Sequence, residues 1–324
     1  MMRGGTMYDV ISFGSITVDV FMDTEAKEKR GKIMYPVGTK ILVNDLDFQT
    51  GGCGMNVAIA LRKLGLKSAL LGRYGKDANG NIIEEALKRE GVDFVGPKPE
   101  GKTGYGIILD SIRHNRTILH FRGASNHVRT GGLNKGRLKA KWFYFASAMS
   151  ESLKTQKDLT ALAARNGTKI AYNPGIRECE KGKRHIGRIL RATELFIANA
   201  EESSALSGKD DKMEMLKAIR SMGPRVVCIT DGARETVCYD GMYFYTLKPH
   251  NTRLVERTGA GDAFSAGMVA GMARGMGIEM SMQMGLADSE SVIRYVGARN
   301  KLLSWKEMMS TIKRNPGKLR KVKA

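Results

Sequence analysis

The sequence predicts an α/β protein built around a doubly wound, mostly parallel sheet with helices on both faces. Two observations lead to this prediction. Short apolar runs alternate along the chain with segments of helical spacing, which is typical of βαβ units. Strand-like segments near 16–48 and 103–121 are too exposed in pattern for the centre of a parallel sheet, so we expect a small separate β-sheet beside the main one.

The first half of the chain supplies the opening strand and most of the small sheet. An apolar run that ends at glycine predicts a buried strand over 8–14. Gly65 and Gly91 are well placed to end two helices, because glycine readily adopts the left-handed conformation that follows a helix. The predicted elements are, in order, a strand over 8–14, extended chain over 33–48, a helix over 56–65, a strand over 67–72, a helix over 77–91, and a hairpin of strands 103–110 and 116–121 joined by a polar turn.

The second half is more regular and ends in helices. Its predicted elements are a strand near 141–148, a helix over 152–167, a strand over 169–173, a basic helix over 181–191, a strand over 194–199, helical chain over 200–221, a strand over 225–230, a β pair over 234–247, and helices over about 259–276, 278–296 and 304–314. Residues 316–324 are basic and terminal, so we expect a disordered tail there.

The charge balance predicts anionic partners. Lys and Arg number 53 against 33 Asp and Glu, a formal net charge of +20. Such a surplus suits phosphorylated metabolites, nucleotides, nucleic acid or anionic lipid. No helix-turn-helix or zinc motif supports nucleic acid. No apolar run approaches the ~20 residues of a membrane span, and four cysteines without a C-x-x-C pair suit reduced thiols. We therefore expect a cytoplasmic protein without a membrane partner.

Residues 258–264, TGAGDAF, place an acid directly after a glycine turn at the start of a helix. Unpaired N–H groups at a helix start attract an anion such as phosphate, and the helix dipole keeps a first-turn carboxylate ionised. Asp262 therefore has the properties of a general base for a hydroxyl that attacks phosphorus. A helix-stabilising acid after a turn explains these seven residues about equally well.

Three stretches suggest a binding site for a small acceptor. Gly52 and Asn56 belong to a glycine cluster over 51–56 that opens a helix, and Asp19 follows the first strand. One carboxylate can accept hydrogen bonds from two sugar hydroxyls. Arg113 and Arg122 lie in a basic hairpin that could cover an anionic substrate. Taken singly, a tight turn, a surface acid and a solvated hairpin are the commoner explanations.

Two stretches suggest a site for a nucleotide. Asn199 and Glu202 have the spacing of a helix capping box, and Glu202 could also hold Mg²⁺ through water, since magnesium usually keeps several waters. Thr230 and Gly232 follow a strand, where backbone amides could meet phosphates. A helix cap and a β-turn explain the same residues structurally.

In their order along the chain these stretches resemble the ribokinase-like, or PfkB, family of sugar kinases. The resemblance covers about residues 8–305 and rests on GSITVD (14–19), GGCGMNVAIALRKLG (51–65), NPG (173–175), NAEE (199–202), ITDGAR (229–234) and RTGAGDAF (257–264). It implies a kinase domain over 1–315 with a β lid formed by about 16–50 and 100–122. It also implies transfer of a phosphoryl group from ATP, with Mg²⁺, to a hydroxyl of a small carbohydrate.

The resemblance also implies a role for each matching residue. Asp262 would be the catalytic base, and Gly259, Ala260 and Gly261 would form an anion hole. The nucleotide would contact Asn199, Thr230, Gly232, Gly259 and Gly261, and Glu202 would act on Mg²⁺. The sugar would contact Asp19, Gly52 and Asn56.

The sequence leaves the acceptor open. Glu256 and Arg257 replace an Asp-Thr pair that is frequent in the family, Cys53 replaces the lysine of ribokinases proper, and 143–150 lack an acid that some members use on the sugar. A nucleoside kinase and a sugar-phosphate kinase remain alternatives. Outside the enzyme class, a non-catalytic sugar or nucleic-acid binder is the rival. A homodimer through the β lid is a further expectation.

Overall fold

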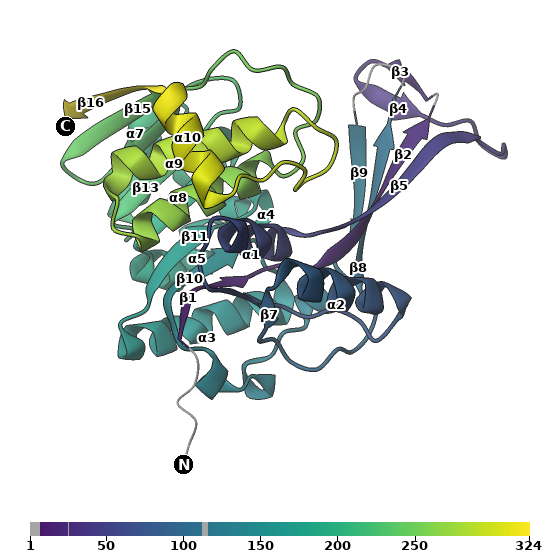
Figure 1. The fold of residues 1–324 in the computed structure, drawn as a ribbon, viewed down its shortest axis with the longest axis horizontal. Coiled ribbons are helices and arrows are strands. Elements are labelled where there is room, and N and C mark those ends of the chain that lie inside the picture. Colours follow the sequence, from purple (N-terminus) through teal and green to yellow (C-terminus); the bar gives the residue numbers. More distant parts are fainter. Residues whose placement is uncertain (1–6, 25, 112–115) are drawn as a thin grey trace.

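The main body of the protein is a ten-stranded sheet with helices on both faces, seen in a computed structural model that describes residues 7–24, 26–111 and 116–324 (Figure 1). The strand order is β16-β15-β14-β13-β12-β11-β10-β1-β6-β7. The parallel part comprises β1 (Tyr8–Phe13), β6 (Ser68–Leu71), β7 (Asp93–Phe94), β10 (Ala140–Ala146), β11 (Lys169–Asn173), β12 (Leu195–Asn199) and β13 (Val226–Thr230). Antiparallel strands β14 (Thr236–Tyr239), β15 (Tyr243–Lys248) and β16 (Lys318–Lys323) complete one edge.

Two hydrophobic cores lie on the two faces of this sheet. Residues of β10 alternate between them, with Trp142 and Tyr144 on one face and Phe143 and Phe145 on the other. The first face carries α1 (Cys53–Lys63), α2 (Ala78–Glu90), α8 (Ala260–Ala273), α9 (Gly277–Val292) and α10 (Trp305–Arg314). The second carries α3 (Ser150–Asn166), α4 (Ile176–Glu180), α5 (Gly182–Ala192), α6 (Ala200–Ser207) and α7 (Lys212–Ser221). This confirms the predicted doubly wound α/β architecture.

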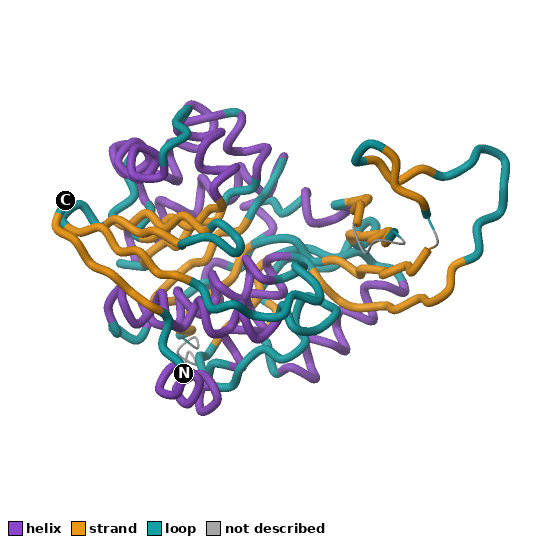
Figure 2. Tube along the Cα trace, turned by 90° about the horizontal axis from the view of Figure 1, so that it is seen from above, coloured by secondary structure: helices purple, strands orange, loops and turns teal. Residues whose placement is uncertain are grey.

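A separate four-stranded sheet, the lid, projects from the main body (Figures 1 and 2). Its order is β5 (Val43–Gly51), β2 (Thr17–Thr24), β8 (Gly104–Asp110) and β9 (Arg116–Phe121). β2 is antiparallel to β5 and parallel to β8, and β8 and β9 pair as a hairpin. A short hairpin of β3 (Lys27–Lys29) and β4 (Lys32–Met34) lies near the tip. The excursions that the sequence separated from the main sheet thus form one small sheet.

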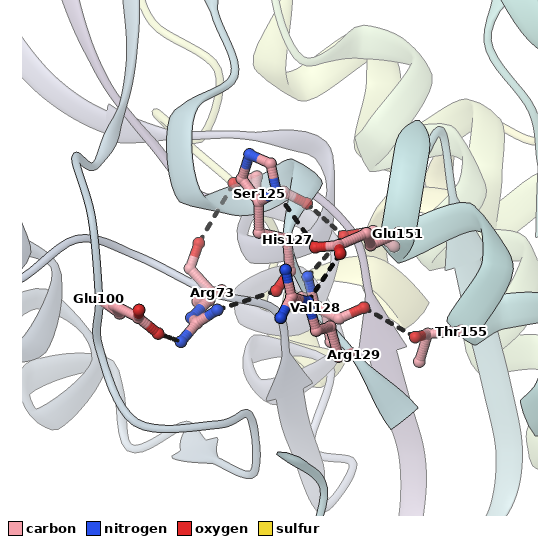
Figure 3. A network of polar contacts seen from close by, with 9 residues as sticks. Arg73, Glu100, Ser125, His127, Val128, Arg129, Glu151 and Thr155 are labelled. Carbon is pink, nitrogen blue, oxygen red and sulfur yellow. Dashed lines mark hydrogen bonds and ion pairs between the residues drawn. The ribbon is translucent and has the colours of Figure 1, made fainter. Parts of the chain in front are cut away.

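A network of polar contacts joins the chain that follows β9 to α3 and to the loop after β6 (Figure 3). Ser125 follows β9, and its hydroxyl accepts from the backbone N–H of Ile16 at 3.0 Å, where β1 passes into β2. The Ser152 hydroxyl of α3 donates to the Ser125 carbonyl at 2.6 Å. Next to it, Glu151 accepts from Arg129 at 2.7 Å. The chain that enters β2 and the chain that leaves β9 are therefore joined at one place.

Two expectations are wrong in detail. Residues 318–323 are not a disordered tail: they form β16, which pairs antiparallel with β15 from Lys318 opposite Lys248 to Lys323 opposite Tyr243. Lysines hide this strand from a hydrophobic pattern, and at a sheet edge they also oppose pairing with other chains. The helical stretch 200–221 is two helices, because Gly208 ends α6 in the left-handed conformation and Asp211 caps α7. In the part of the chain that the structure describes, no helix is long and apolar enough to cross a bilayer.

Candidate active site

The start of α8 presents unpaired backbone donors. Gly259 caps the helix with φ 82°, and a Cβ there would lie 2.2 Å from the carbonyl oxygen of Ala298, so only glycine fits. The N–H of Ala260 donates to the Arg257 carbonyl at 3.2 Å. Within the described residues, the N–H groups of Gly261 and Asp262 have no backbone acceptor. Such orphan donors at a helix start bind anions.

A cavity of about 210 Å³ opens in front of this helix start. Three of its lining residues, Asn173, Asn199 and Thr230, are the last residues of β11, β12 and β13. The carboxyl ends of parallel strands are where doubly wound folds bind their ligands. The remaining lining residues are Ile197, Glu202, Gly259, Gly261, Asp262 and Ser265.

Asp262 contacts a buried amide of α1. The Nδ2 of Asn56 donates to Asp262 Oδ2 at 2.8 Å, and Asn56 is only 5% exposed. The other amide atom, Asn56 Oδ1, is buried without a partner among the described residues. Burial raises the pKa of Asp262 to about 6, the Asn56 hydrogen bond opposes this rise, and the charge of Asp19 adds to it. A carboxylate with a pKa near neutrality is suited to exchange protons with a hydroxyl.

Asp19, on β2 of the lid, has its carboxylate surrounded by glycine backbone. A Cβ on Gly51 would lie 2.0 Å from Asp19 Oδ2, and a Cβ on Gly106 would lie 2.4 Å from Asp19 Oδ1. The carboxylate therefore lies across the two neighbouring strands in space that side chains would otherwise fill. Burial raises the Asp19 pKa, while the Thr17 hydroxyl and the charge of Arg299 lower it.

Asn199 and Glu202 form a reciprocal helix cap. The Asn199 N–H donates to Glu202 Oε2 at 3.0 Å, and the Glu202 N–H donates to Asn199 Oδ1 at 2.8 Å. Burial raises the pKa of Glu202 to about 7, against the lowering effect of the Asn199 N–H, and the charges of Glu178 and Glu201 raise it further. The capping interpretation of the sequence is therefore correct, and both residues also line the cavity.

Comparison with known proteins gives the family. The sequence matches the pfkB family of carbohydrate kinases over residues 7–305. The chain belongs to this family. Its enzymatic class follows: PfkB carbohydrate kinases are phosphotransferases with an alcohol group as acceptor.

Individual relatives agree with this assignment. The kinase is 30% identical over 251 residues to an uncharacterised sugar kinase of Archaeoglobus fulgidus. The matched region covers 75% of this chain and 98% of the relative. Its fold resembles the Methanocaldococcus jannaschii nucleoside kinase (TM-score 0.80, 20% identity, 96% of this chain and 100% of that one). It equally resembles an Arabidopsis thaliana ribokinase complexed with ribose and ATP (TM-score 0.81, 20% identity, 95% and 99%).

Some predicted residues of the PfkB kinase lie elsewhere than in the cavity. Gly52 shapes the start of α1, with φ 92°, and a Cβ there would lie 2.5 Å from the Ser15 carbonyl oxygen. Gly232 is exposed in the turn after β13, with φ 58°, outside the cavity lining. Arg113 lies outside the described residues. Arg122 reaches from the lid to Ser147 of the main body, donating to its hydroxyl at 2.9 Å and to its carbonyl at 3.3 Å.

Sequence reasoning on the PfkB kinase missed Arg299. Its guanidinium donates to the carbonyl and hydroxyl of Thr50 at the base of the lid, and its charge acts on Asp19. Burial lowers the pKa of Arg299 to about 10. A single arginine 249 residues from its partner, in a stretch without a recognised motif, gives no signal in one sequence.

Proposed function

We propose that the protein is an ATP- and Mg²⁺-dependent sugar kinase that transfers the γ-phosphoryl group to a hydroxyl of a small carbohydrate. The observation that carries the proposal is the Asp262–Asn56 pair. The half-buried carboxylate of Asp262 has a raised pKa and contacts an amide whose oxygen is buried without a described partner. It lies at a helix start with unpaired N–H groups.

The acceptor is placed between the lid and α8. Asn56 Oδ1 accepts a hydrogen bond from an acceptor hydroxyl, which supplies the partner that this oxygen lacks. Asp19 accepts from further hydroxyls of the sugar. Asp262 takes the proton of the attacking hydroxyl as it bonds to phosphorus.

The nucleotide occupies the cavity at the carboxyl ends of β11 to β13. The N–H groups of Gly261 and Asp262 donate to the transferring phosphoryl group, whose negative charge they stabilise without reorganisation. Thr230 and Asn199, which line the same cavity, bind phosphates further along the chain of the nucleotide.

The residues present fit a magnesium ion held mainly by the nucleotide. Glu202, with Asn173 and Asn199, gives the cavity the oxygen ligands that magnesium prefers. Among the residues that the structure describes, no group of three acidic, histidine or cysteine side chains is placed to hold a metal. Glu202 would hold the ion through water. When bound, the ion neutralises phosphate charge.

The test is ATP consumption with Mg²⁺ across ribose, ribose 1-phosphate, fructose, fructose phosphates, 2-keto-3-deoxygluconate, adenosine and cytidine. A positioned base contributes roughly 10²–10⁴-fold in rate, so Asp262→Asn should lose about that factor in kcat with nucleotide affinity unchanged. Asp210→Asn, an exposed acid of α6–α7, is the matched control. Near-normal turnover of Asp262→Asn would refute the assignment, and turnover only with nucleosides would replace the sugar as acceptor.

We also propose that two copies associate through their lids. Phe48, Val20, Ile107 and Leu119 lie opposite one another across β5, β2, β8 and β9, so Phe48 and Leu119 are on the same face of the lid sheet. These two side chains are 57% and 53% exposed, and Phe121 nearby is 53% exposed. Exposed apolar patches mark interaction sites. Phe48→Glu should shift sedimentation to a monomer, whereas Ile82→Glu on α2 should not; unchanged sedimentation of Phe48→Glu would refute the lid contact.

A further inference from the structure

The loop between α9 and α10, residues 293–304, contacts both the lid and the start of α8. On the lid side, a Cβ on Gly297 would lie 2.1 Å from Oε1 of Gln49, so the backbone of the loop packs closely against this side chain of β5. On the other side, the carbonyl oxygen of Ala298 packs against Gly259. The next residue of the loop is Arg299, which therefore lies where the lid meets the helix start.

Arg299 is bonded to the lid and keeps one nitrogen without a partner. Its Nη2 donates to the backbone carbonyl and to the hydroxyl of Thr50, whereas its Nη1 is buried without a hydrogen-bond partner among the described residues. Within residues 7–24, 26–111 and 116–324, Arg299 forms no ion pair with an acid. A buried cation is stable only when negative charge lies close by.

The charges around Arg299 leave Asp19 as the acid that balances it. Burial lowers the pKa of Arg299 to about 10, the charges of Glu90 and Asp19 oppose this fall, and the charge of Arg89 adds to it. Glu90 and Arg89 are neighbours at the end of α2, and Arg89 Nε lies 3.8 Å from Glu90 Oε1. Their charges therefore largely offset each other at Arg299, and the charge of Asp19 remains.

Asp19 in turn lies beside the loop that carries Arg299. It is directly opposite Gln49, the residue that contacts the loop, and residues opposite each other point to the same face of a sheet. Its Oδ2 lies 2.0 Å from the Cβ position of Gly51, the residue after the one that Arg299 binds. Burial raises the pKa of Asp19, and the hydroxyl of Thr17 and the charge of Arg299 lower it. The arginine thus favours the ionised carboxylate.

We propose that Arg299 is a positioning residue that acts through Asp19: its guanidinium is the counter-charge of this carboxylate and so sets how tightly the lid binds the acceptor. The proposal rests on the kinase function proposed above, in which Asp19 accepts hydrogen bonds from sugar hydroxyls. An ionised carboxylate accepts with both oxygens, whereas a protonated one donates from one of them. A direct ion pair would occupy oxygens that the sugar needs, and Arg299 avoids this because it is bonded to Thr50 instead.

The first experiment measures the KM of the acceptor at two pH values, with saturating ATP and Mg²⁺ and with ribose, or with fructose if fructose is the better acceptor. Arg299→Gln removes the cation and keeps a donor for Thr50, so the pKa of Asp19 rises and its carboxyl is protonated over more of the acid range. The ratio of KM in Arg299→Gln to KM in the wild type should therefore be at least about fivefold larger at pH 5.5 than at pH 8.5. An equal ratio at both pH values would show that Arg299 only holds the lid, and it would overturn the proposal.

Two further variants separate charge from packing. Arg299→Lys keeps the charge, and Thr50→Val removes the hydroxyl that Arg299 binds while the charge stays, so any rise in KM should be the same at both pH values. Arg184→Gln, at an exposed position of α5, is the matched control and should change KM at neither pH. A pH-dependent loss in Arg299→Lys or Thr50→Val as large as that in Arg299→Gln contradicts the charge argument. If Arg299→Gln does not fold, Arg299→Met, which keeps the length of the side chain, takes its place.

Asp19→Asn distinguishes failure of this proposal from failure of the kinase function. It should raise the KM of the sugar at pH 8.5 at least about tenfold, and Arg299→Gln should add no pH-dependent loss in this background, because no carboxyl is left to titrate. An unchanged KM in Asp19→Asn refutes the binding of the acceptor by Asp19, and this proposal with it. A raised KM in Asp19→Asn together with a pH-independent ratio for Arg299→Gln refutes only the role of Arg299 and leaves the kinase function.

Discussion

The hydrogen bond from Asn56 to Asp262 should control the pH at which the kinase gains activity. Asp262 acts as a base only when ionised, and its pKa is raised to about 6. The acid limb of kcat/KM should therefore have its midpoint near pH 6, with a fall of about tenfold between pH 7 and pH 5. Asn56 and Asp19 act on this carboxyl in opposite directions.

Two variants should move the acid limb in opposite directions. A hydrogen bond to a charged group contributes about 1.5–3 kcal/mol, or about 1–2 pKa units. Asn56→Ala removes such a bond from the ionised form, so the midpoint should rise to roughly pH 7–8. Asp19→Asn removes a repelling charge, so the midpoint should fall below that of the wild type.

The assay is kcat/KM from pH 4.5 to 9 in a buffer of constant ionic strength, with saturating Mg²⁺ and ATP. Both variants weaken acceptor binding, so the position of the limb is compared and its height is not. Asp210→Asn again serves as the charge control. If both limbs stay at the wild-type midpoint, or move in the same direction, Asp262 is not the group that titrates and the proposed base is wrong.

Three further predictions concern stability and space at the site. The pKa of Asp262 in the folded protein is raised above its ordinary 3.8, so its ionisation costs stability as the pH rises from about 4 to 6. Asp262→Asn should therefore increase the unfolding free energy by up to about 3 kcal/mol at pH 7 and by almost nothing at pH 4. An equal gain at both pH values in urea titrations would contradict the burial argument. The methyl group of Gly261→Ala meets no atom within 4 Å and alanine favours the helix, so the melting temperature should stay the same. The methyl group fills space in front of the unpaired N–H groups, so kcat should fall at least tenfold. An unchanged kcat would show that no phosphoryl group binds there. Ser125→Ala leaves the buried N–H of Ile16 without its acceptor, which should lower the free energy of unfolding in urea by about 1–3 kcal/mol. The exposed control Ser221→Ala should lower it by under about 0.5 kcal/mol. Similar values for both variants would show that the network does not hold the lid.

The elements and the central site could be predicted because their signals are local. The periodicity of strands and helices can be recognised within a few consecutive residues, and the segments of the lid strands are more polar than those of the main sheet. Asp262 and Asn56 each lie near a helix start marked by glycines, so the motifs indicated the backbone geometry around both residues. Their direct contact at 2.8 Å across 206 residues follows only from the packing of α1 against α8.

The contacts that join lid and main body could not be predicted. The tertiary fold brings together single side chains that are far apart in the sequence. Arg299 donates to Thr50, and Arg122 donates to Ser147, which in turn donates to Glu178. No spacing rule connects such residues, and nothing in the sequence marks Glu178, in the short helix α4, as buried. β16 was missed for a related reason, since a strand stabilised by pairing with β15 needs no apolar alternation of its own.

The glycine backbone around Asp19 limits how this enzyme could diversify. Any side chain at 51 or 106 would collide with the Asp19 carboxylate, so both positions must stay glycine as long as Asp19 is retained. New acceptor preferences would then arise at other positions in register with Asp19, such as 49, directly opposite it on β5, and 120, on β9 beyond Gly106. A library built at those two positions would explore acceptor choice without altering the carboxylate that we propose to bind the sugar.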